Sequence, residues 1–252
     1  LKPFGLKAPP THVRVPRMAG TVEALIFDCD GTLVDTETPY RQSLNEIVAR
    51  LSAGAGPEVC PERWGAEFSG RGVQRCAELG AAICGAEVTA GAFLDAWLAR
   101  FSELIAEPGS VPLLPGFDEL YAHARTKGLR VAVASSSDGA GLLLKLRNGV
   151  LAQSAALKAV DGPGGFDIVT SNDDVTRHKP DPEIYLLTAE RLGVAPERCW
   201  VVEDTSTGVA AGKSAGMRVA AVPNPYTKGN DFSRADVVLE TMAEVIPLLN
   251  GP

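Results

Sequence analysis

Long hydrophobic runs are absent from this sequence, and so is any surplus of positive charge. No apolar stretch approaches the roughly 18 residues that a membrane-spanning helix needs. The 24 Lys and Arg residues are outnumbered by 31 Asp and Glu residues, and no basic run is interleaved with aromatic residues. These absences argue against a membrane span and against a general nucleic-acid surface. With a net charge of −7, the chain needs a local positive field to bind an anionic substrate.

Cysteine is scarce and scattered. The five cysteines are odd in number and include no Cys-x-x-Cys pair, so neither a disulfide framework nor a zinc site is predicted. A reducing compartment fits this pattern. Cys29, which lies between two aspartates, is either a small buried side chain or an oxidation-sensitive thiol, and the first interpretation is favoured.

The remaining composition is that of a globular protein. At 252 residues, 45% of them hydrophobic, the chain is long enough for one large domain with an insertion. Residues 1–20 differ, because they contain basic residues and prolines but no acidic residue, which predicts a flexible basic arm. This arm is either a transit-peptide remnant or a plain disordered or tag-derived segment. A soluble protein of the chloroplast stroma is slightly favoured, with the cytoplasm as the alternative.

An apolar run at residues 24–27 has the length and composition of a buried parallel strand, and it leads into Asp28, Asp30 and Gly31. Ligands of open α/β sheets bind beyond the carboxyl ends of strands. There, these residues offer a nucleophile, a second acid or base, and free backbone amides for an anion. Two carboxylates this close repel each other unless a cation or a shared proton lies between them, so a metal ion is expected. A lone Asp-x-Asp pair is more often a turn, so this interpretation needs partners further along the chain.

After Asp35 the pattern becomes helical. Apolar residues recur at helical spacing, and no convincing strand appears before the Pro- and Gly-rich segment 107–116. Helices are expected near residues 40–51, 61–68, 71–84 and 89–106. We therefore predict an all-helical cap domain at residues 36–112, inserted after the first strand and placed to act as a hinged lid.

From residue 117 onward, strands and helices alternate as in a doubly wound parallel sheet. Strands are expected at residues 129–134, 167–170, 199–202, 218–222 and 237–238. Helices are expected at residues 117–127, 138–147, 182–192 and 206–215 and at the C-terminus. The Gly-rich segment 148–166 is either a short helix with loops or a mobile connection. The predicted fold class is α/β, with a Rossmann-like catalytic core at residues 21–35 and 113–252 and the helical cap inserted into it.

Three polar stretches follow later strands. Ser135, Ser136 and Ser137 come directly after one strand, where hydroxyls and turn amides suit phosphate oxygens, although the last two also fit as helix caps. Lys179 precedes Pro-Asp-Pro at the start of a helix, where its ammonium can bridge a phosphate and a carboxylate. A Glu-Asp pair at 203–204 ends another apolar strand and can complete an oxygen-ligand set for Mg²⁺.

In this order, the four stretches resemble the motifs of the haloacid dehalogenase (HAD) superfamily, over residues 22–222. The resemblance implies a Mg²⁺-dependent phosphatase with an aspartyl-phosphate intermediate. Asp28 would attack phosphorus, and Asp30 would protonate the leaving group and then deprotonate the hydrolytic water. Ser135 and Lys179 would hold the phosphoryl oxygens. The implied metal ligands are Asp28, the backbone carbonyl of Asp30 and Asp204. Glu203 would either bind the ion directly or contact the residues that bind it.

Within the superfamily, residues 172–185 and the start of the cap look most like CbbY-type sugar-bisphosphate phosphatases, which implies xylulose 1,5-bisphosphate as the kind of substrate. Residues expected to contact the substrate are Glu37, Gly70, Arg71, Arg75, Ser136 and Ser137. The glutamate is equally an acid at a helix N-terminus, and the arginines are equally surface charges.

Other functions fit less well. A dehalogenase has no use for Asp30 or for the acidic pair at 203–204. A β-phosphoglucomutase-like phosphomutase resembles the core but carries a histidine at the cap hinge, where this sequence has Tyr40. Phosphoglycolate and hexose monophosphates remain alternative substrates, and a non-catalytic binding protein is disfavoured because every motif residue is present. We expect a monomer that acts on a small phosphorylated sugar.

Overall fold

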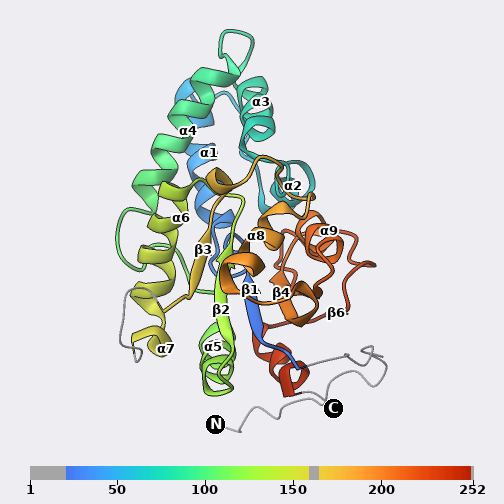
Figure 1. Ribbon diagram of the computed structural model, residues 1–252. Coiled ribbons are helices and arrows are strands. Elements are labelled where there is room, and N and C mark those ends of the chain that lie inside the picture. Colours follow the sequence, from blue (N-terminus) through green and yellow to red (C-terminus); the bar gives the residue numbers. More distant parts are fainter. Residues whose placement is uncertain (1–20, 159–164, 251–252) are drawn as a thin grey trace, which may run out of the picture.

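A six-stranded parallel sheet forms the centre of the molecule, which is described by a computed structural model over residues 21–158 and 165–250 (Figure 1). The strand order is β3-β2-β1-β4-β5-β6. The strands are β1 (Ala24–Phe27), β2 (Arg130–Ala134), β3 (Ile168–Thr170), β4 (Cys199–Glu203), β5 (Arg218–Ala221) and β6 (Val237–Val238). The direction of the order reverses between β1 and β4, and ligands of doubly wound sheets bind in the crevice at such a reversal. The predicted fold class is confirmed.

Helices cover both faces of the sheet because its strands are buried on both sides. In β1, Leu25 and Phe27 belong to one apolar cluster and Ala24 and Ile26 to the other, as the alternation of side chains along a strand requires. The first cluster is covered by α5 (Phe117–Thr126), α6 (Gly139–Lys145) and η4 (Met242–Asn250), and the second by α8 (Glu183–Leu192) and α9 (Ser206–Ser214).

Short polar residues begin the helices that follow β2 and β4. The Asp138 carboxylate accepts a hydrogen bond from the Gly141 amide at 2.8 Å at the start of α6. The Thr205 hydroxyl accepts one from the Gly208 amide at 3.1 Å at the start of α9. Each cap satisfies a backbone donor that the first turn leaves unpaired, so the chain turns into a helix directly after β2 and after β4.

Two segments in the C-terminal half of the chain form helices that are not regular α-helices. After α6 the chain continues through a π-helical turn, η1 (Leu146–Leu151), and α7 (Ala155–Lys158), which favours the helical interpretation of the segment 148–166. Residues 159–164 lie outside the described part of the chain. The predicted C-terminal helix is a 3₁₀ helix that contains Pro247, a residue without a backbone donor for an α-helical hydrogen bond.

Four helices lie between β1 and α5, as the sequence predicted. They are α1 (Glu37–Leu51), α2 (Pro61–Glu67), α3 (Val73–Cys84) and α4 (Ala90–Leu104), and they are called the helical insertion below. They share their own apolar cluster, which includes Trp64, Phe93 and Trp97. Figure 1 shows them gathered at one end of the sheet. The boundaries of the cap at residues 36 and 112 stay a prediction.

The chain leaves the core and returns to it along adjacent segments. The Leu114 amide donates to the Leu33 carbonyl at 2.8 Å, and the Asp35 amide donates to the Pro112 carbonyl at 2.9 Å. Phe101 in the last turn of α4 and Ile105 directly after this helix also pack in the sheet cluster. The helical insertion is therefore joined to the core shortly after β1 by two connections that hydrogen-bond to each other.

None of the described helices has the length and apolar character needed to cross a membrane. The predicted basic arm at residues 1–20 lies outside the described residues, so its conformation and its link to a plastid stay predictions.

Candidate active site

The carboxyl ends of β1, β2 and β4 bring the predicted motif residues to one edge of the sheet. Asp28 follows β1, Ser135 follows β2 and Glu203 ends β4, and these three strands are parallel neighbours with matched registers. Lys179 reaches the same place from the segment before α8. Residues more than 150 positions apart in the sequence, such as Asp28 and Lys179, are thus in direct contact.

Lys179 is almost fully buried and uses its ammonium group to join two carboxylates. Its Nζ donates to Asp28 Oδ1 at 2.6 Å, to Glu203 Oε1 at 2.8 Å and to the Ala134 carbonyl at 3.1 Å. Burial alone would lower the pKa of Lys179, but the charges of Asp28 and Glu203 outweigh burial and raise this pKa well above its usual value. The lysine therefore stays charged, and all three of its protons are directed at protein oxygens.

Glu203 is fully buried and surrounded by donors. Its Oε1 accepts hydrogen bonds from Lys179 and, at 2.9 Å, from the Tyr185 hydroxyl. Its Oε2 accepts from the amides of Asp204 and Thr205 and from the Thr205 hydroxyl. The first turn of α9 can approach the Glu203 carboxylate this closely because residue 208 is glycine. A Cβ at this position would lie 1.6 Å from Glu203 Oε1. Both oxygens of Glu203 therefore position Lys179 and the loop after β4.

Asp204 differs from Glu203 because it receives only neutral donors. Thr32 Oγ1 donates to Oδ1 at 3.1 Å and Asn224 Nδ2 donates to Oδ2 at 2.8 Å. Within the described residues, no lysine or arginine forms an ion pair with it. Burial, together with the charges of Glu203 and Asp28, raises the pKa of Asp204 well above its usual value. This carboxylate is buried without a compensating charge.

The acidic groups fit a divalent cation. Asp28, Glu203 and Asp204 each offer one oxygen, and these oxygens lie within 4.8 Å of one another. Three buried carboxylates share a single ammonium group, so the site has an excess of negative charge that a divalent cation would offset. The same imbalance appears in Asp28, because burial raises its pKa from 3.8 to about 7 even though Lys179 opposes the shift. Hard oxygen ligands of this kind suit Mg²⁺.

The carboxylate of Asp30 points toward a second lysine, not toward these acids. Its Oδ1 accepts from Lys145 Nζ at 2.5 Å, and its Oδ2 accepts from the hydroxyls of Ser137 at 2.8 Å and Ser135 at 3.2 Å. Burial would raise the pKa of Asp30, but the charge and hydrogen bond of Lys145 and the bond from Ser137 lower it overall. Only the backbone carbonyl of Asp30 then remains for the predicted metal contact, which stays a prediction.

The three predicted serines lie in different surroundings. Ser135 is fully buried, and because its hydroxyl proton is directed at Asp30, contact with a phosphoryl oxygen requires this hydroxyl to turn. The Ser137 hydroxyl donates to Asp30 and accepts from Lys145 at 2.6 Å, so its hydrogen bonds in this structure go to these two side chains. Ser136 is exposed. Substrate contacts of all three stay predictions.

The predicted substrate residues of the helical insertion lie on two small cavities. One, of about 120 Å³, is lined by Glu37, Gly70 and the indole rings of Trp64 and Trp97 among others. The Glu37 carboxylate accepts hydrogen bonds from Trp64 Nε1 and, at 3.0 Å, from the Ser69 hydroxyl. Burial raises the pKa of Glu37 despite these two donors. Glu37 is the first residue of α1, as the helix-start interpretation expects, and its carboxylate also accepts hydrogen bonds inside the insertion. Its contact with a substrate stays a prediction.

A second cavity, of about 560 Å³, joins the insertion to the core. It is lined by Ser69, Gly70, Arg71, Arg75, Ser206, Thr207 and Asn230. Arg75 forms an ion pair with Glu78 at 2.7 Å, whereas Arg71 donates to the Ala66 carbonyl at 3.2 Å and forms no ion pair with the described residues. Arg71 therefore has more of its guanidinium available to an anion than Arg75 has.

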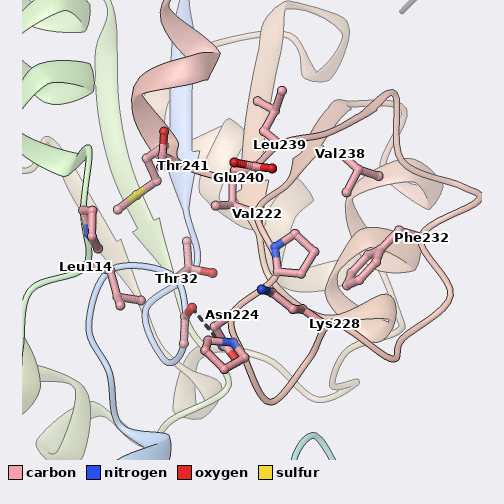
Figure 2. A pocket seen from close by; sticks show the side chains of 15 residues that line it. Thr32, Leu114, Val222, Asn224, Lys228, Phe232, Val238, Leu239, Glu240 and Thr241 are labelled. Carbon is pink, nitrogen blue, oxygen red and sulfur yellow. Dashed lines mark hydrogen bonds between the residues drawn. The ribbon is translucent and has the colours of Figure 1, made fainter. Parts of the chain in front are cut away.

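Sequence reasoning missed three residues of this site. Lys145 lies on a helix without a motif around it. Thr32 and Asn224 hold Asp204, and both line a groove of about 730 Å³ (Figure 2). Asn224 also donates to the Gly31 carbonyl at 3.2 Å, so it ties the first motif to the fourth. A polar residue shortly after β5 was the available signal for Asn224.

Cys29, between the two aspartates, is fully buried. Burial and the neighbouring charge of Asp30 raise the pKa of its thiol well above the usual value. The thiolate that oxidation requires is therefore disfavoured, which supports the interpretation of Cys29 as a small packing residue.

Comparisons with known proteins agree with this architecture. A family model described as haloacid dehalogenase-like hydrolase matches residues 22–216. Protein CbbY from Rhodobacter capsulatus is 35% identical over 219 residues, which cover 85% of this chain and 91% of that protein. The CBBY-like protein of Arabidopsis thaliana is 34% identical over 239 residues, 88% of this chain and 69% of that protein. A crystal structure of a CbbY variant from Rhodobacter sphaeroides in complex with xylulose 1,5-bisphosphate is 30% identical, with a TM-score of 0.71 and coverage of 89% of this chain and 96% of that one.

Proposed function

Because the chain belongs to the haloacid dehalogenase-like hydrolase family, we propose that it is a Mg²⁺-dependent phosphatase of a small phosphorylated sugar. The observation that carries this proposal is the meeting of Asp28 with Lys179, Glu203 and Asp204 at one strand edge, with Asp30 two residues away. A nucleophile, a fixed positive charge, a set of metal ligands and a second carboxylate are then all present in one buried place.

Asp28 is the proposed nucleophile. One of its carboxylate oxygens attacks phosphorus, the bond from phosphorus to the sugar oxygen breaks, and the sugar oxygen leaves with its electron pair and takes up a proton. Lys179, at 2.6 Å from Asp28 Oδ1, orients this carboxylate and offsets the charge that would repel a phosphate. Glu203 holds the lysine in place from the other side.

Asp30 is the proposed acid and base. Because Lys145 lowers the pKa of Asp30, the carboxylate first takes up a proton from solvent and then gives it to the departing sugar oxygen. It later accepts a proton from the water that attacks the phosphorus of the aspartyl-phosphate. That second attack breaks the bond to Asp28 and releases inorganic phosphate. The two aspartates thus divide nucleophilic attack and proton transfer between them.

Mg²⁺ would be held by Asp28, by Asp204 and by the backbone carbonyl of Asp30. Glu203 would support these ligands instead of binding the ion, because its two oxygens accept five hydrogen bonds, one of them from the Lys179 ammonium, whereas each oxygen of Asp204 accepts one. When bound, the ion neutralises charge between a carboxylate and a phosphate and polarises the phosphoryl oxygens. Thr32 and Asn224 orient Asp204 toward it.

We infer that the substrate is a sugar bisphosphate of the xylulose 1,5-bisphosphate kind. The related structure that binds this compound supports the inference, and so does the cavity of about 560 Å³ in which Arg71 faces polar groups of the core. Glu37 is placed to accept hydrogen bonds from sugar hydroxyls inside the helical insertion. A phosphomutase is less favoured because Tyr40, at the hinge position, stacks its ring on Phe101 and offers no base there. A plastid location and a monomeric state stay predictions.

Release of inorganic phosphate from a panel of substrates tests the proposal. The panel contains xylulose 1,5-bisphosphate, glucose 1-phosphate and phosphoglycolate, each with Mg²⁺ and with EDTA. We expect Mg²⁺-dependent release that is fastest for the bisphosphate, and none from the Asp28→Asn variant. Release that persists in EDTA would remove the metal from the account, and equal slow release from all three compounds would remove the bisphosphate preference.

A further inference from the structure

Lys145 is a buried charge that the catalytic scheme above does not use. It is the last residue of α6, and only 2% of its side chain is exposed. Its Nζ lies 2.5 Å from Asp30 Oδ1 and 2.6 Å from the Ser137 hydroxyl. A lysine is rarely buried to this extent unless a partner requires it, and here the partner is the proposed acid and base.

The other side of the Lys145 ammonium faces the helical insertion. Nζ lies 5.7 Å from the ring centre of Tyr40 and 5.8 Å from that of Phe101, within the range of cation–π attraction. These rings belong to α1 and α4 and stack on each other with centres 3.7 Å apart. Lys145 therefore lies where the core meets the insertion and touches groups from both.

The contacts fix the direction of the Asp30 carboxylate. Lys145 holds Oδ1, while Ser135 and Ser137 hold Oδ2, so the carboxylate plane has one favoured orientation. Loss of Lys145 would free Oδ1 and would also remove the partner that keeps Ser137 in place. Because proton transfer requires the carboxylate within hydrogen-bond reach of the reacting oxygen, its orientation matters for rate more than for substrate binding.

We propose that Lys145 is a positioning residue that orients Asp30 for proton transfer and, through its contact with Tyr40 and Phe101, makes this orientation depend on the placement of the helical insertion. The proposal rests on the proposed phosphatase function. Lys145 acts on the reaction only through Asp30, and it does not touch the phosphoryl group.

The test is a double-mutant cycle with p-nitrophenyl phosphate and with a sugar phosphate that the wild-type enzyme hydrolyses. Lys145→Met is expected to lower kcat by on the order of 10-fold to 100-fold while KM changes less than about threefold, because the loss concerns a step after binding. Lys145→Arg, which keeps a donor and a charge, is expected to recover part of kcat. The double variant Lys145→Met with Asp30→Asn is expected to match Asp30→Asn alone within about twofold.

The aryl substrate adds a second readout. Nitrophenolate leaves without a proton, so the attack by Asp28 proceeds, whereas hydrolysis of the aspartyl-phosphate still needs Asp30 to take the proton of water. Lys145→Met should therefore show a burst of nitrophenolate close to the enzyme concentration, followed by slow turnover. A purely structural role would lower the burst and the steady rate together.

The link to the insertion is tested by Tyr40→Leu and Phe101→Leu. Each is expected to lower kcat in the wild-type background and to have no further effect in the Lys145→Met background. Lys213→Met is the matched control, because Lys213 also forms an ion pair, with Asp236 at 2.7 Å, but lies away from the site. Its kcat should equal that of the wild type.

Two results would overturn the proposal. One is a kcat for Lys145→Met that equals the wild type, and the other is a double variant with Asp30→Asn that is slower than Asp30→Asn by the full effect of Lys145→Met. If Lys145→Met does not fold, Lys145→Arg carries the same comparison, alone and combined with Asp30→Asn. A wild-type protein that hydrolyses no phosphate ester would instead refute the proposed function.

Discussion

Replacing Glu203 by glutamine separates a structural role from a metal-binding role for this fully buried side chain. Glutamine keeps the shape but presents an NH₂ group where one oxygen accepted hydrogen bonds, so it meets either Lys179 and Tyr185 or the donors of the loop with another donor. Removal of one partner of a buried charge pair costs about 3–5 kcal/mol. Relief of the repulsion among the acidic groups offsets part of this, and we expect the unfolding free energy of the metal-free protein to fall by about 2–4 kcal/mol.

Denaturant unfolding in EDTA measures this loss, and titration with Mg²⁺ measures the metal affinity of the same variant. We expect the midpoint of unfolding to fall while the Mg²⁺ affinity changes less than about threefold, because a residue behind the metal ligands acts on it indirectly. Glu67→Gln is the control, since its exposed pair with Arg63 should cost about 0.3–0.5 kcal/mol. Unchanged stability with a Mg²⁺ affinity lowered more than about tenfold would show that Glu203 is a ligand and that the reasoning is wrong.

Three further predictions follow from the same geometry. The pKa of Asp28 is raised from 3.8 to about 7 in the folded, metal-free protein, so its contribution to stability is present below pH 4 and is lost as the pH rises through about 7. The difference in unfolding free energy between the wild type and Asp28→Asn, measured in EDTA, should therefore decline over this range, and a difference that stays constant would refute it. Asn224→Ala should raise the Mg²⁺ concentration for half-maximal activity by about 10-fold, with little change in kcat at saturation, because Asp204 loses the hydrogen bond that orients it; an unchanged Mg²⁺ requirement would contradict this role. Arg71→Ala should raise KM about tenfold for a bisphosphate and leave KM for a monophosphate unchanged, as measured by initial rates; equal effects on both substrates would place Arg71 outside the binding of a second phosphate.

The strands and most residues of the candidate site could be predicted from the sequence because the signals are local. The sequence predicts buried strands at residues 24–27 and 199–202, and the second extends to Glu203 in the structure. Their parallel arrangement requires the groups at their carboxyl ends to meet at one edge of the sheet. The contact of Lys179 with Asp28 follows from this topology, because the segment before α8 returns to the same edge. The helical insertion was predictable because the apolar residues after Asp35 recur at the spacing of a helix and not at that of a strand.

The orientation of Asp30 could not be predicted, because it depends on where α6 packs. Lys145 lies ten positions after Ser135 on an otherwise apolar helix, and nothing in its neighbourhood distinguishes it from a surface lysine. Only tertiary packing turns it toward Asp30 and the two aromatic rings. The hydrogen bonds to Glu203 could not be predicted for the same reason. One of them comes from the hydroxyl of Tyr185 in α8, and this contact depends on how α8 packs on the sheet.

The central claim is that Asp28 becomes phosphorylated during turnover, and acid-quenched mass spectrometry tests it most directly. The Asp30→Asn variant, which should form the intermediate but hydrolyse it slowly, is mixed with p-nitrophenyl phosphate and Mg²⁺, quenched and digested. We predict one added phosphoryl group on the peptide that contains Asp28, and none when Asp28 is also replaced by asparagine. Nitrophenolate release without a phosphorylated peptide, or a phosphoryl group on another residue, would contradict the account.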